Sequence, residues 1–348
     1  MKKKINHILP ALVLTASLGL TTVSCNGFLD EMPDNRTELN TDQKIAKLLV
    51  SAYADVSPNE LFELYSDNSD DSGPTYGYYK LSEQECYHWQ DTKEEYQDTP
   101  NSLWGGYYSA IAAANMALNA IEEKGNAASL DPQRGEALVC RAYCHFMLAN
   151  IFCNAYDTHA SQSLGVPYME EVETTVSPRY ERGTLEEVYR KVERDLLEGI
   201  DLISDDSYSV PKYHFTRKAA YAFAARFYLY YMKPDFSNCD RVIDFATRVL
   251  GTNPADLLRN WEALGNLSVN GNVQADAYIA SSNEANLLIS STVSNWGAIG
   301  SDYLIGPRYF HNQTLATSET CLSSGLWGSS DYFYLKPFST NGFVASIL

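Results

Sequence analysis

The chain has 348 residues, and its 26 Lys and Arg against 44 Asp and Glu give a formal net charge of −18. An apolar fraction of 45% is ordinary for a folded protein and argues against disorder. The acidic balance argues against a nucleic-acid binder, because phosphate binding depends on clustered Lys and Arg. Aromatic residues are frequent, with 25 Tyr, 13 Phe and 5 Trp, so we expect surfaces that both stack and hydrogen-bond.

Residues 1–24 have the order of a signal peptide. A basic start at Lys2–Lys4 is followed by an uncharged apolar run from Ile8 to Leu20, which is too short to span a bilayer comfortably. The sequence Thr22-Val23-Ser24-Cys25 then resembles a lipobox, and it predicts that Cys25 is lipidated. A plain secretory signal, with Cys25 incidental, is the alternative. An anchor of more than one acyl chain would hold the mature protein stably on a membrane.

Helical signals begin after a polar tether over residues 25–40. Thr41 predicts the N-cap of a first helix through about Val56. Residues 57–99 hold no sustained period and are dense in Tyr, Asp and Ser, so we expect long loops there. From Pro100 onward, residues three and four apart predict a helix with one buried stripe. The stripe contains Trp104, Tyr107, Ile111, Ala114, Leu118 and Ile121, and we expect Trp104 to lie in the core.

A third helix is expected to be the centre of the fold. It begins at Asp131-Pro132, and its part from Ala137 to Phe152 is apolar on nearly every side. Within this part, Cys140 and Cys144 are interpreted as small core residues. Arg141 lies in the same apolar surroundings and therefore predicts a buried acidic partner with a structural role.

Three more helices follow before about residue 250. Thr184 and Glu187 form a capping box for the fourth helix, which should end near Ile203. Thr216 caps the fifth, and the sixth runs from about Cys239 to Leu250. The fold class predicted is mostly α: tetratricopeptide-like helix pairs over residues 41–265, without a strict repeat. Residues 266–348 should form a loop-rich region with few short strands.

Five motifs occur in one order along the chain. They are Cys25-Asn26-Gly27-Phe28-Leu29-Asp30-Glu31 with Pro33; Trp104…Tyr107-Tyr108…Ile111…Asn115; Glu136-Ala137…Arg141-Ala142-Tyr143…Phe146 with Gly165-Val166-Pro167; Thr184…Val188-Tyr189…Asp195-Leu196; and Ala224-Ala225-Arg226…Tyr228-Leu229. In this series the chain resembles the SusD/RagB family of surface lipoproteins from Gram-negative, gut-type bacteria.

The resemblance implies a helical scaffold without catalysis. Family members lie on the outer face of the outer membrane, over a SusC-like TonB-dependent transporter. They bind oligosaccharides, or in some branches peptides, and pass them to that barrel for import. The family's later helices have no counterpart before Leu348, so we expect a short or truncated member.

Two loop regions carry the residue types that bind sugars. Aromatic rings stack on the flat C–H faces of a sugar, and polar side chains bind its hydroxyls. Residues 76–97 and 295–327 supply both types, and we expect them to form the ligand-binding side of the protein. The candidates are Tyr78, Trp89, Asn295, Trp296, Tyr303 and Tyr309. The alternative for each ring is that it caps the helical core.

No metal, cofactor or enzymatic function is predicted. The acidic run from Asp67 to Gly73 has its glycine one place late for a calcium loop, and Tyr78 stands where Glu is needed. Cys86 and His88 lack further zinc ligands nearby. The sequence contains no HExxH, no GxSxG and no phosphate-binding glycine loop.

Three functions remain open at this point. The first is the capture of oligosaccharides for a SusC-like transporter by a lipid-anchored protein on the cell surface. The second is the capture of peptides by the same scaffold, which the negative charge would bias toward basic ones. The third is assembly or adhesion without a small ligand.

Overall fold

The computed structural model describes residues 39–74, 80–175, 178–268, 273–294 and 308–310, together with the strands at 339–340 and 343–347. The chain divides into the units Met1–Leu39 and Asn40–Leu348. All of the helices and strands described below belong to the second unit. The predicted signal peptide, Cys25 and most of the tether lie outside the described residues.

The first helix, α3 (Asp42–Leu48), begins where the sequence predicts. The Thr41 hydroxyl accepts a hydrogen bond from the Lys44 N–H, so Thr41 is the N-cap. The chain continues as the 3-10 turn η1 (Leu49–Ala52), which ends before the predicted limit at Val56.

The prediction of uninterrupted loops over residues 57–99 is wrong at two places. Two short helices, α4 (Asn59–Leu64) and α5 (Leu81–Tyr87), form within this range. Each spans fewer than two full turns, so neither is long enough to display a helical period in the sequence. Their buried side chains Leu61, Leu64 and Cys86 pack together in a small core cluster.

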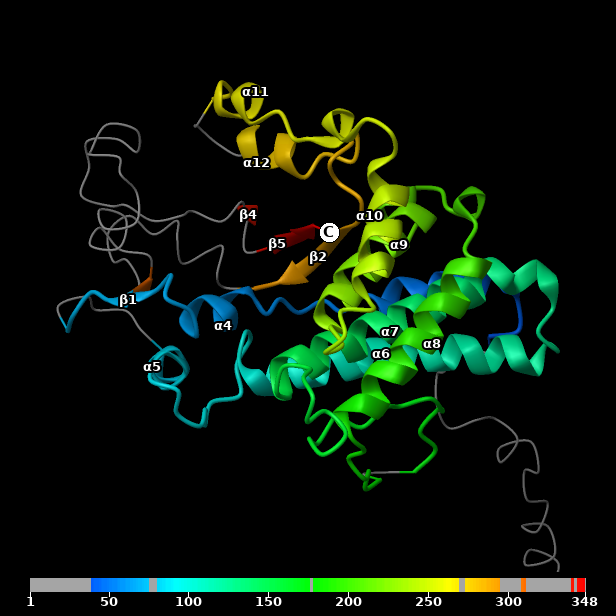
Figure 1. The fold of residues 1–348 in the computed structure, drawn as a ribbon, viewed down its shortest axis with the longest axis horizontal. Coiled ribbons are helices and arrows are strands. Elements are labelled where there is room, and N and C mark those ends of the chain that lie inside the picture. The colour runs from blue at the N-terminus through cyan, green and yellow to red at the C-terminus, as the bar shows by residue number, and fades with distance from the viewer. Residues whose placement is uncertain are drawn as a thin grey trace, which may run out of the picture. The chain divides into compact units, whose positions relative to one another are not determined.

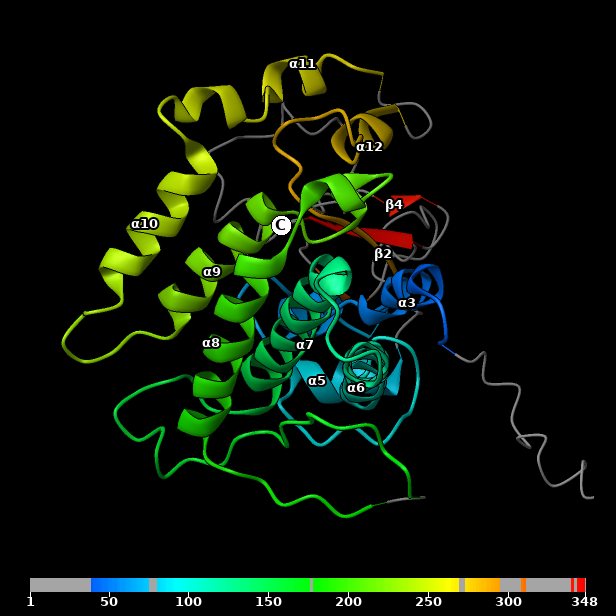
Figure 2. The same ribbon diagram turned by 90° about the vertical axis from the view of Figure 1, so that its right-hand side faces the viewer.

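Five longer helices form the body of the second unit. They are α6 (Pro100–Glu123), α7 (Asp131–Phe152), α8 (Leu185–Leu202), α9 (Arg217–Tyr230) and α10 (Cys239–Leu250). Each packs against the next, and Figure 2 shows them in this order from α6 to α10. The predicted capping box of Thr184 with Glu187 and the N-cap at Thr216 are both present. The mostly helical fold predicted from the sequence is confirmed.

Helices α7 and α8 approach each other closely at two glycines, Gly135 and Gly199. A Cβ atom on Gly135 would lie 2.8 Å from the carbonyl oxygen of Gly199, and one on Gly199 would lie 2.8 Å from the carbonyl oxygen of Gly135. No larger residue fits at either position without moving the helices apart. This contact brings the polar residues of both helices within hydrogen-bonding reach of one another.

Helix α7 is central, as its apolar sequence predicts. Cys140 and Cys144 are buried as core residues, and Leu148 is completely inaccessible to solvent. We therefore expect Leu148→Ala to lower the free energy of unfolding by about 2–5 kcal/mol, because the change removes buried methyl groups and leaves a cavity. Urea denaturation measures this loss. A loss below about 0.5 kcal/mol, as at surface positions, would contradict the central placement.

The remaining described elements are short. Three 3-10 turns, η2 (Ala128–Leu130), η3 (Asp205–Ser207) and η4 (Pro211–Tyr213), lie between the long helices. After α10 come η5 (Pro254–Leu257), α11 (Trp261–Gly265) and α12 (Val273–Tyr278). Helix α12 lies in the range 266–348, for which loops and a few short strands are predicted, and it is too short to show a period in the sequence.

Strands form two small antiparallel sheets. In the first, β2 (Ile289–Val293) pairs with β5 (Phe343–Ile347), and β5 pairs with β4 (Ser339–Thr340). In the second, β1 (Asp70–Asp71) pairs with β3 (Tyr309–Phe310). Figure 1 shows β2 and β5 side by side. None of the helices in the described ranges is long and apolar enough to cross a membrane.

Candidate ligand-binding site

The end of α5 places Trp89 in an uncommon backbone conformation. The Trp89 N–H donates to the Cys86 carbonyl at 2.9 Å, and the Gln90 N–H donates to the Glu85 carbonyl at 2.8 Å. These two bonds form a Schellman motif, whose left-handed position is usually occupied by glycine. Here that position is Trp89, with φ of 56°. A residue with a Cβ atom adopts this conformation at a cost of about 1–2 kcal/mol.

The Trp89 side chain is held on the surface by one neighbour. Its ring stacks on Tyr65, with 4.6 Å between the ring centroids and 22° between the planes. Trp89 nevertheless remains 73% exposed, so the face turned away from Tyr65 is open to solvent. An exposed aromatic ring with one open face can stack on a flat ligand. Trp89 and Tyr65 are called the aromatic platform below.

Tyr309 does not belong to this exposed platform. It is 1% exposed and packs in the small core cluster with Leu61, Leu64 and Cys86. Its ring centroid lies 4.7 Å from that of Tyr87. A ring enclosed in this way has no free face for a sugar, so the interpretation of Tyr309 as a stacking residue is wrong. The alternative, that the ring caps the core, describes it correctly.

The segment that carries Tyr309 is fastened beside α5 by an ion pair. The Arg308 guanidinium donates to both carboxylate oxygens of Asp71, at 2.6 and 2.7 Å. These hydrogen bonds lower the pKa of Asp71. Asp71 belongs to the acidic run from Asp67 to Gly73, whose spacing departs from that of a calcium loop. Among the residues that the structure describes, no group of three or more His, Cys, Asp or Glu is arranged to hold a metal ion.

The structure describes two of the six predicted binding residues. Tyr78, Asn295, Trp296 and Tyr303 lie outside the described residues. Of the six predicted binding residues, the structure therefore places Trp89 on the surface and Tyr309 in the core. Sequence reasoning missed Tyr65, because nothing in a sequence indicates that a ring 24 positions before Trp89 stacks on it.

Trp104 is less buried than the sequence analysis expects. It is 36% exposed, and its ring packs against Tyr108 and Phe152 with centroid separations of 4.9 and 5.1 Å. The prediction that it lies in the core is therefore wrong. The buried stripe of α6 begins at the neighbouring Leu103, which is 0% exposed, and the Trp104 ring packs beside it on Phe152 of α7.

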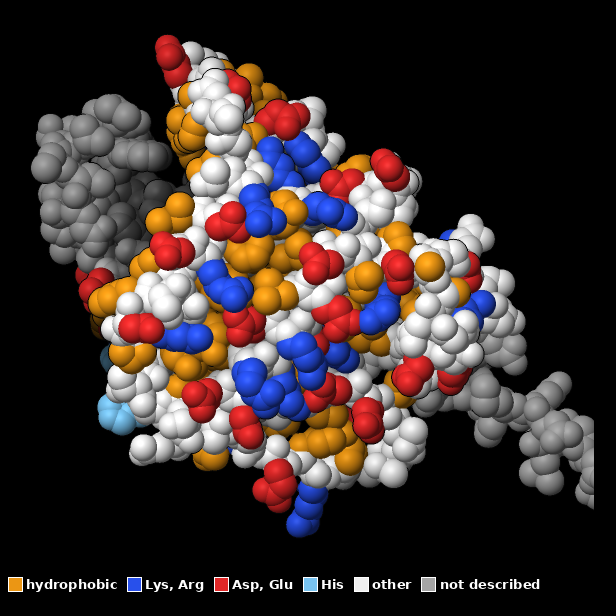
Figure 3. Space-filling model, turned by 45° about the vertical axis from the view of Figure 1, so that its right-hand side comes forward, with side chains coloured by type: hydrophobic (Ala, Val, Ile, Leu, Met, Phe, Trp, Pro, Cys, Tyr) orange, Lys and Arg blue, Asp and Glu red, His pale blue; other side chains and the backbone are white. Residues whose placement is uncertain are grey.

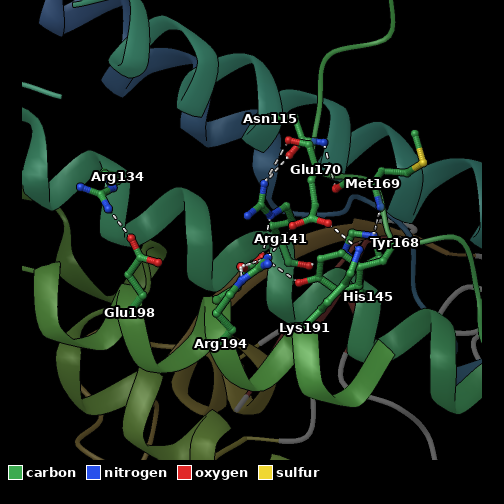
Figure 4. A network of polar contacts seen from close by, with 11 residues as sticks. Asn115, Arg134, Arg141, His145, Tyr168, Met169, Glu170, Lys191, Arg194 and Glu198 are labelled. Atoms are coloured by element: carbon green, nitrogen blue, oxygen red, sulfur yellow. Dashed lines mark hydrogen bonds and ion pairs between the residues drawn. The ribbon is translucent and has the colours of Figure 1, made fainter. Parts of the chain in front are cut away.

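A polar network fixes the chain that follows α7 (Figure 4). Arg141 on α7 donates from Nε to Asp195 on α8 at 2.6 Å and from Nη1 to Asn115 on α6 at 3.0 Å. The Tyr168 hydroxyl donates to the same Asp195 carboxylate at 2.7 Å. The predicted buried acidic partner of Arg141 is thus confirmed as Asp195. The contacts join three helices and one loop, which is a structural role.

His145 occupies the inner end of this network. It is 0% exposed, its Nδ1 lies 2.9 Å from the Arg141 carbonyl oxygen, and its Nε2 accepts the Met169 N–H at 3.0 Å. Burial is the main cause that lowers the pKa of His145 to about 3. The ring is therefore neutral, with Nδ1 carrying the proton that it donates to the carbonyl.

The outer end of the network reaches the surface. Glu170 accepts hydrogen bonds from Lys191 and Arg194, and Arg134 pairs with Glu198 nearby. Figure 3 shows Lys and Arg side chains interspersed with Asp and Glu across the face that it draws. Basic and acidic groups compensate each other on that face, and no basic patch of the kind that binds nucleic acid is formed there.

A family model agrees with this fold. The model, SusD-like_3, is described as starch-binding associating with outer membrane, and it matches residues 27–229. No curated protein gives a sequence match.

Solved structures resemble the chain at low sequence identity. A SusD superfamily protein from Bacteroides vulgatus ATCC 8482 superposes with a TM-score of 0.60 and 17% identity, covering 88% of this chain and 71% of that one. A SusD-like carbohydrate binding protein from the same organism superposes with a TM-score of 0.56 and 16% identity, covering 78% of this chain and 56% of that one. A SusD superfamily protein from Bacteroides thetaiotaomicron VPI-5482 superposes with a TM-score of 0.51 and 20% identity, covering 65% of this chain and 50% of that one. The last two coverages mean that the chain spans about half the length of those proteins. These likenesses establish the fold.

Proposed function

The chain belongs to the SusD-like family, described as starch-binding and associated with the outer membrane, and on that premise we propose that it captures oligosaccharides at the cell surface. It acts as a binding protein without catalysis, and it delivers the bound sugar to a SusC-like TonB-dependent transporter. A lipid on Cys25 anchors it to the outer membrane in this proposal. The family match supports the class of function, and the aromatic platform supports a particular place for the ligand.

One observation supports sugar binding on the platform most directly. Trp89 is 73% exposed, stacked on Tyr65 and held at a φ of 56°. A flat, apolar ring of this kind, stacked on a second ring, matches the C–H face of a pyranose. His88 and Gln90, on either side of Trp89, offer hydrogen-bonding groups for sugar hydroxyls. The solved structure named as a carbohydrate binding protein is consistent with this choice of ligand.

Peptide capture is the second candidate, and the net charge of −18 is the observation that favours it. A basic peptide would be attracted to a strongly acidic protein, but it has no need of a rigid tryptophan face. Platform stacking therefore favours sugars, and charge alone favours peptides.

Replacing Trp89 with glycine tests the proposed site. We expect Trp89→Gly to weaken binding of an oligosaccharide by about 1–3 kcal/mol, on the scale measured for bases stacked on aromatic rings. The melting temperature should change little, because glycine relieves the left-handed strain while the stack on Tyr65 is lost. Isothermal titration calorimetry, with the tightest-binding oligosaccharide from a glycan array, measures the affinity.

Trp261→Ala is the matched control. Trp261 is also a surface tryptophan, 62% exposed, but it lies on α11 and not on the platform. Its removal should leave the affinity unchanged. Equal affinities for wild type and Trp89→Gly, with both proteins folded, would show that the platform is not the binding site.

A further inference from the structure

A pocket of about 230 Å³ lies between the long helices and β2, and the platform residues do not line it. Its walls come from η1 and the chain after it, from α6, α7 and α9, and from β2. The strand closes one side, since the Val293 N–H donates to the Asp55 carbonyl at 2.7 Å. Five aromatic rings form much of the lining: Tyr53, Phe62, Tyr107, Tyr143 and Phe215. The pocket therefore offers several ring faces to a small ligand.

Polar groups enter the pocket from two elements. Ser290 and Thr292 both line it, because alternate residues of β2 point to the same side of the strand. Asn59, the first residue of α4, lines the pocket as well. Hydroxyl and amide groups among aromatic rings are the combination that binds a sugar ring.

Among the described residues that line the pocket, Arg226 is the one that carries a charge, and none of them is Asp or Glu. It lies on α9, is partly buried, and its guanidinium carbon is 5.7 Å from the ring centroids of both Phe146 and Tyr230. Within the described part of the chain, no carboxylate pairs with it. Arg141, by contrast, is paired with Asp195 at 2.6 Å. Arg226 also shares a side-chain hydrogen bond with Tyr143, which lines the pocket. A ligand carboxylate would accept two further parallel hydrogen bonds from the guanidinium and balance its charge.

We propose that this pocket binds a single sugar ring that carries a carboxylate, a hexuronate, with the carboxylate on Arg226. The apolar face of the ring packs on the aromatic wall, and its hydroxyls bond to Ser290, Thr292 and Asn59. A volume near 230 Å³ is below the range typical of drug-sized ligands, which fits one ring and not a chain. The pocket is a second site, and it depends on the proposed function only for the choice of a sugar as the ligand.

The wild-type protein with two probes provides the first test. D-glucuronate and its uncharged methyl ester differ only at the group that Arg226 would bind. Calorimetry on the whole chain should show that the acid binds about tenfold more tightly than the ester, or better, as expected for bonds to a charged group. Added salt should reduce this preference. Equal affinities, or no binding of the acid at millimolar concentration, would overturn the proposal.

Variants then assign the preference to Arg226. Arg226→Gln should abolish the preference for the acid, while Arg226→Lys should retain part of it, because the charge remains and the fork of donors is lost. Arg248→Gln is the matched control. Arg248 lies on α10 and pairs with Asp244, so this variant should bind like wild type. If glucuronate binding is instead lost in Trp89→Gly and unaffected in Arg226→Gln, the pocket is not the site. That outcome would leave the platform proposal standing, so the two proposals fail separately.

Discussion

Replacing Arg141 with Met should lower the free energy of unfolding by about 3–5 kcal/mol, the loss typical of breaking a buried ion pair. The guanidinium donates to three acceptors: Asp195 at 2.6 Å, Asn115 at 3.0 Å and the Glu170 carbonyl at 3.3 Å. Methionine fills similar space but donates to none of them. Asp195 is 0% exposed, so water does not replace the lost donor.

Arg134→Met is the matched control for this prediction. Arg134 lies on the same helix and pairs with Glu198 on the same partner helix, but both side chains are partly exposed (Figure 4). Its replacement should cost less than about 1 kcal/mol, as for other surface ion pairs. Urea denaturation of both variants gives the comparison. Similar losses at the two positions would mean that the Arg141–Asp195 pair is not buried as described.

The second large effect is a fall in the free energy of unfolding at low pH, which His145 causes. In the folded protein, burial lowers the pKa of His145 to about 3, whereas an unfolded histidine titrates near its ordinary value of about 6.5. Between these values the unfolded chain binds a proton that the folded chain does not. The contribution of His145 is therefore fully present above about pH 6.5 and is lost as the pH falls toward 3, by up to about 1.4 kcal/mol for each pH unit.

The neighbours of His145 explain the direction of this effect. A protonated ring would place a second positive charge beside Arg141 and would remove the acceptor for the Met169 N–H. Asp195 and Glu170 act in the opposite sense, but the loss of hydration on burial outweighs them. The Tyr168 ring stacks on the His145 ring, with 3.8 Å between the centroids, and covers that face of the imidazole from water.

A variant that does not titrate isolates this contribution. Gln at position 145 keeps one donor and one acceptor, so His145→Gln should show a shallower loss of stability between pH 6.5 and 4 than wild type. His159→Gln, at an exposed histidine, serves as the control and should retain the wild-type slope. Unfolding free energies across this pH range provide the measurement. Parallel curves for wild type and His145→Gln would contradict a buried, neutral ring.

The long helices could be predicted from the sequence because their signals are local. Thr41, Thr216 and the pair Thr184 with Glu187 cap the helices that they predict, since a cap is a contact over three residues. The apolar surroundings of Arg141 likewise required an acidic partner. By contrast, α4 and α5 are shorter than two turns and leave no period to detect.

The candidate site was less predictable because it depends on contacts between distant residues. Tyr309 is buried by the pairing of β3 with β1, which joins Tyr309 to Asp71. The left-handed backbone at Trp89 follows from the way α5 ends. A glycine usually marks such a position in a sequence, and here none does. Residue type alone therefore selected one ring that is exposed, Trp89, and one that is buried, Tyr309.

Oligosaccharide capture is tested most directly by presenting the whole chain to a glycan array and to a peptide panel under the same conditions. Sugar stacking on the aromatic platform predicts binding to at least one oligosaccharide on the array, binding that weakens in Trp89→Gly, and no comparable binding in the panel. Binding to basic peptides with no signal on the glycan array would contradict the account, because charge and not the tryptophan face would then select the ligand.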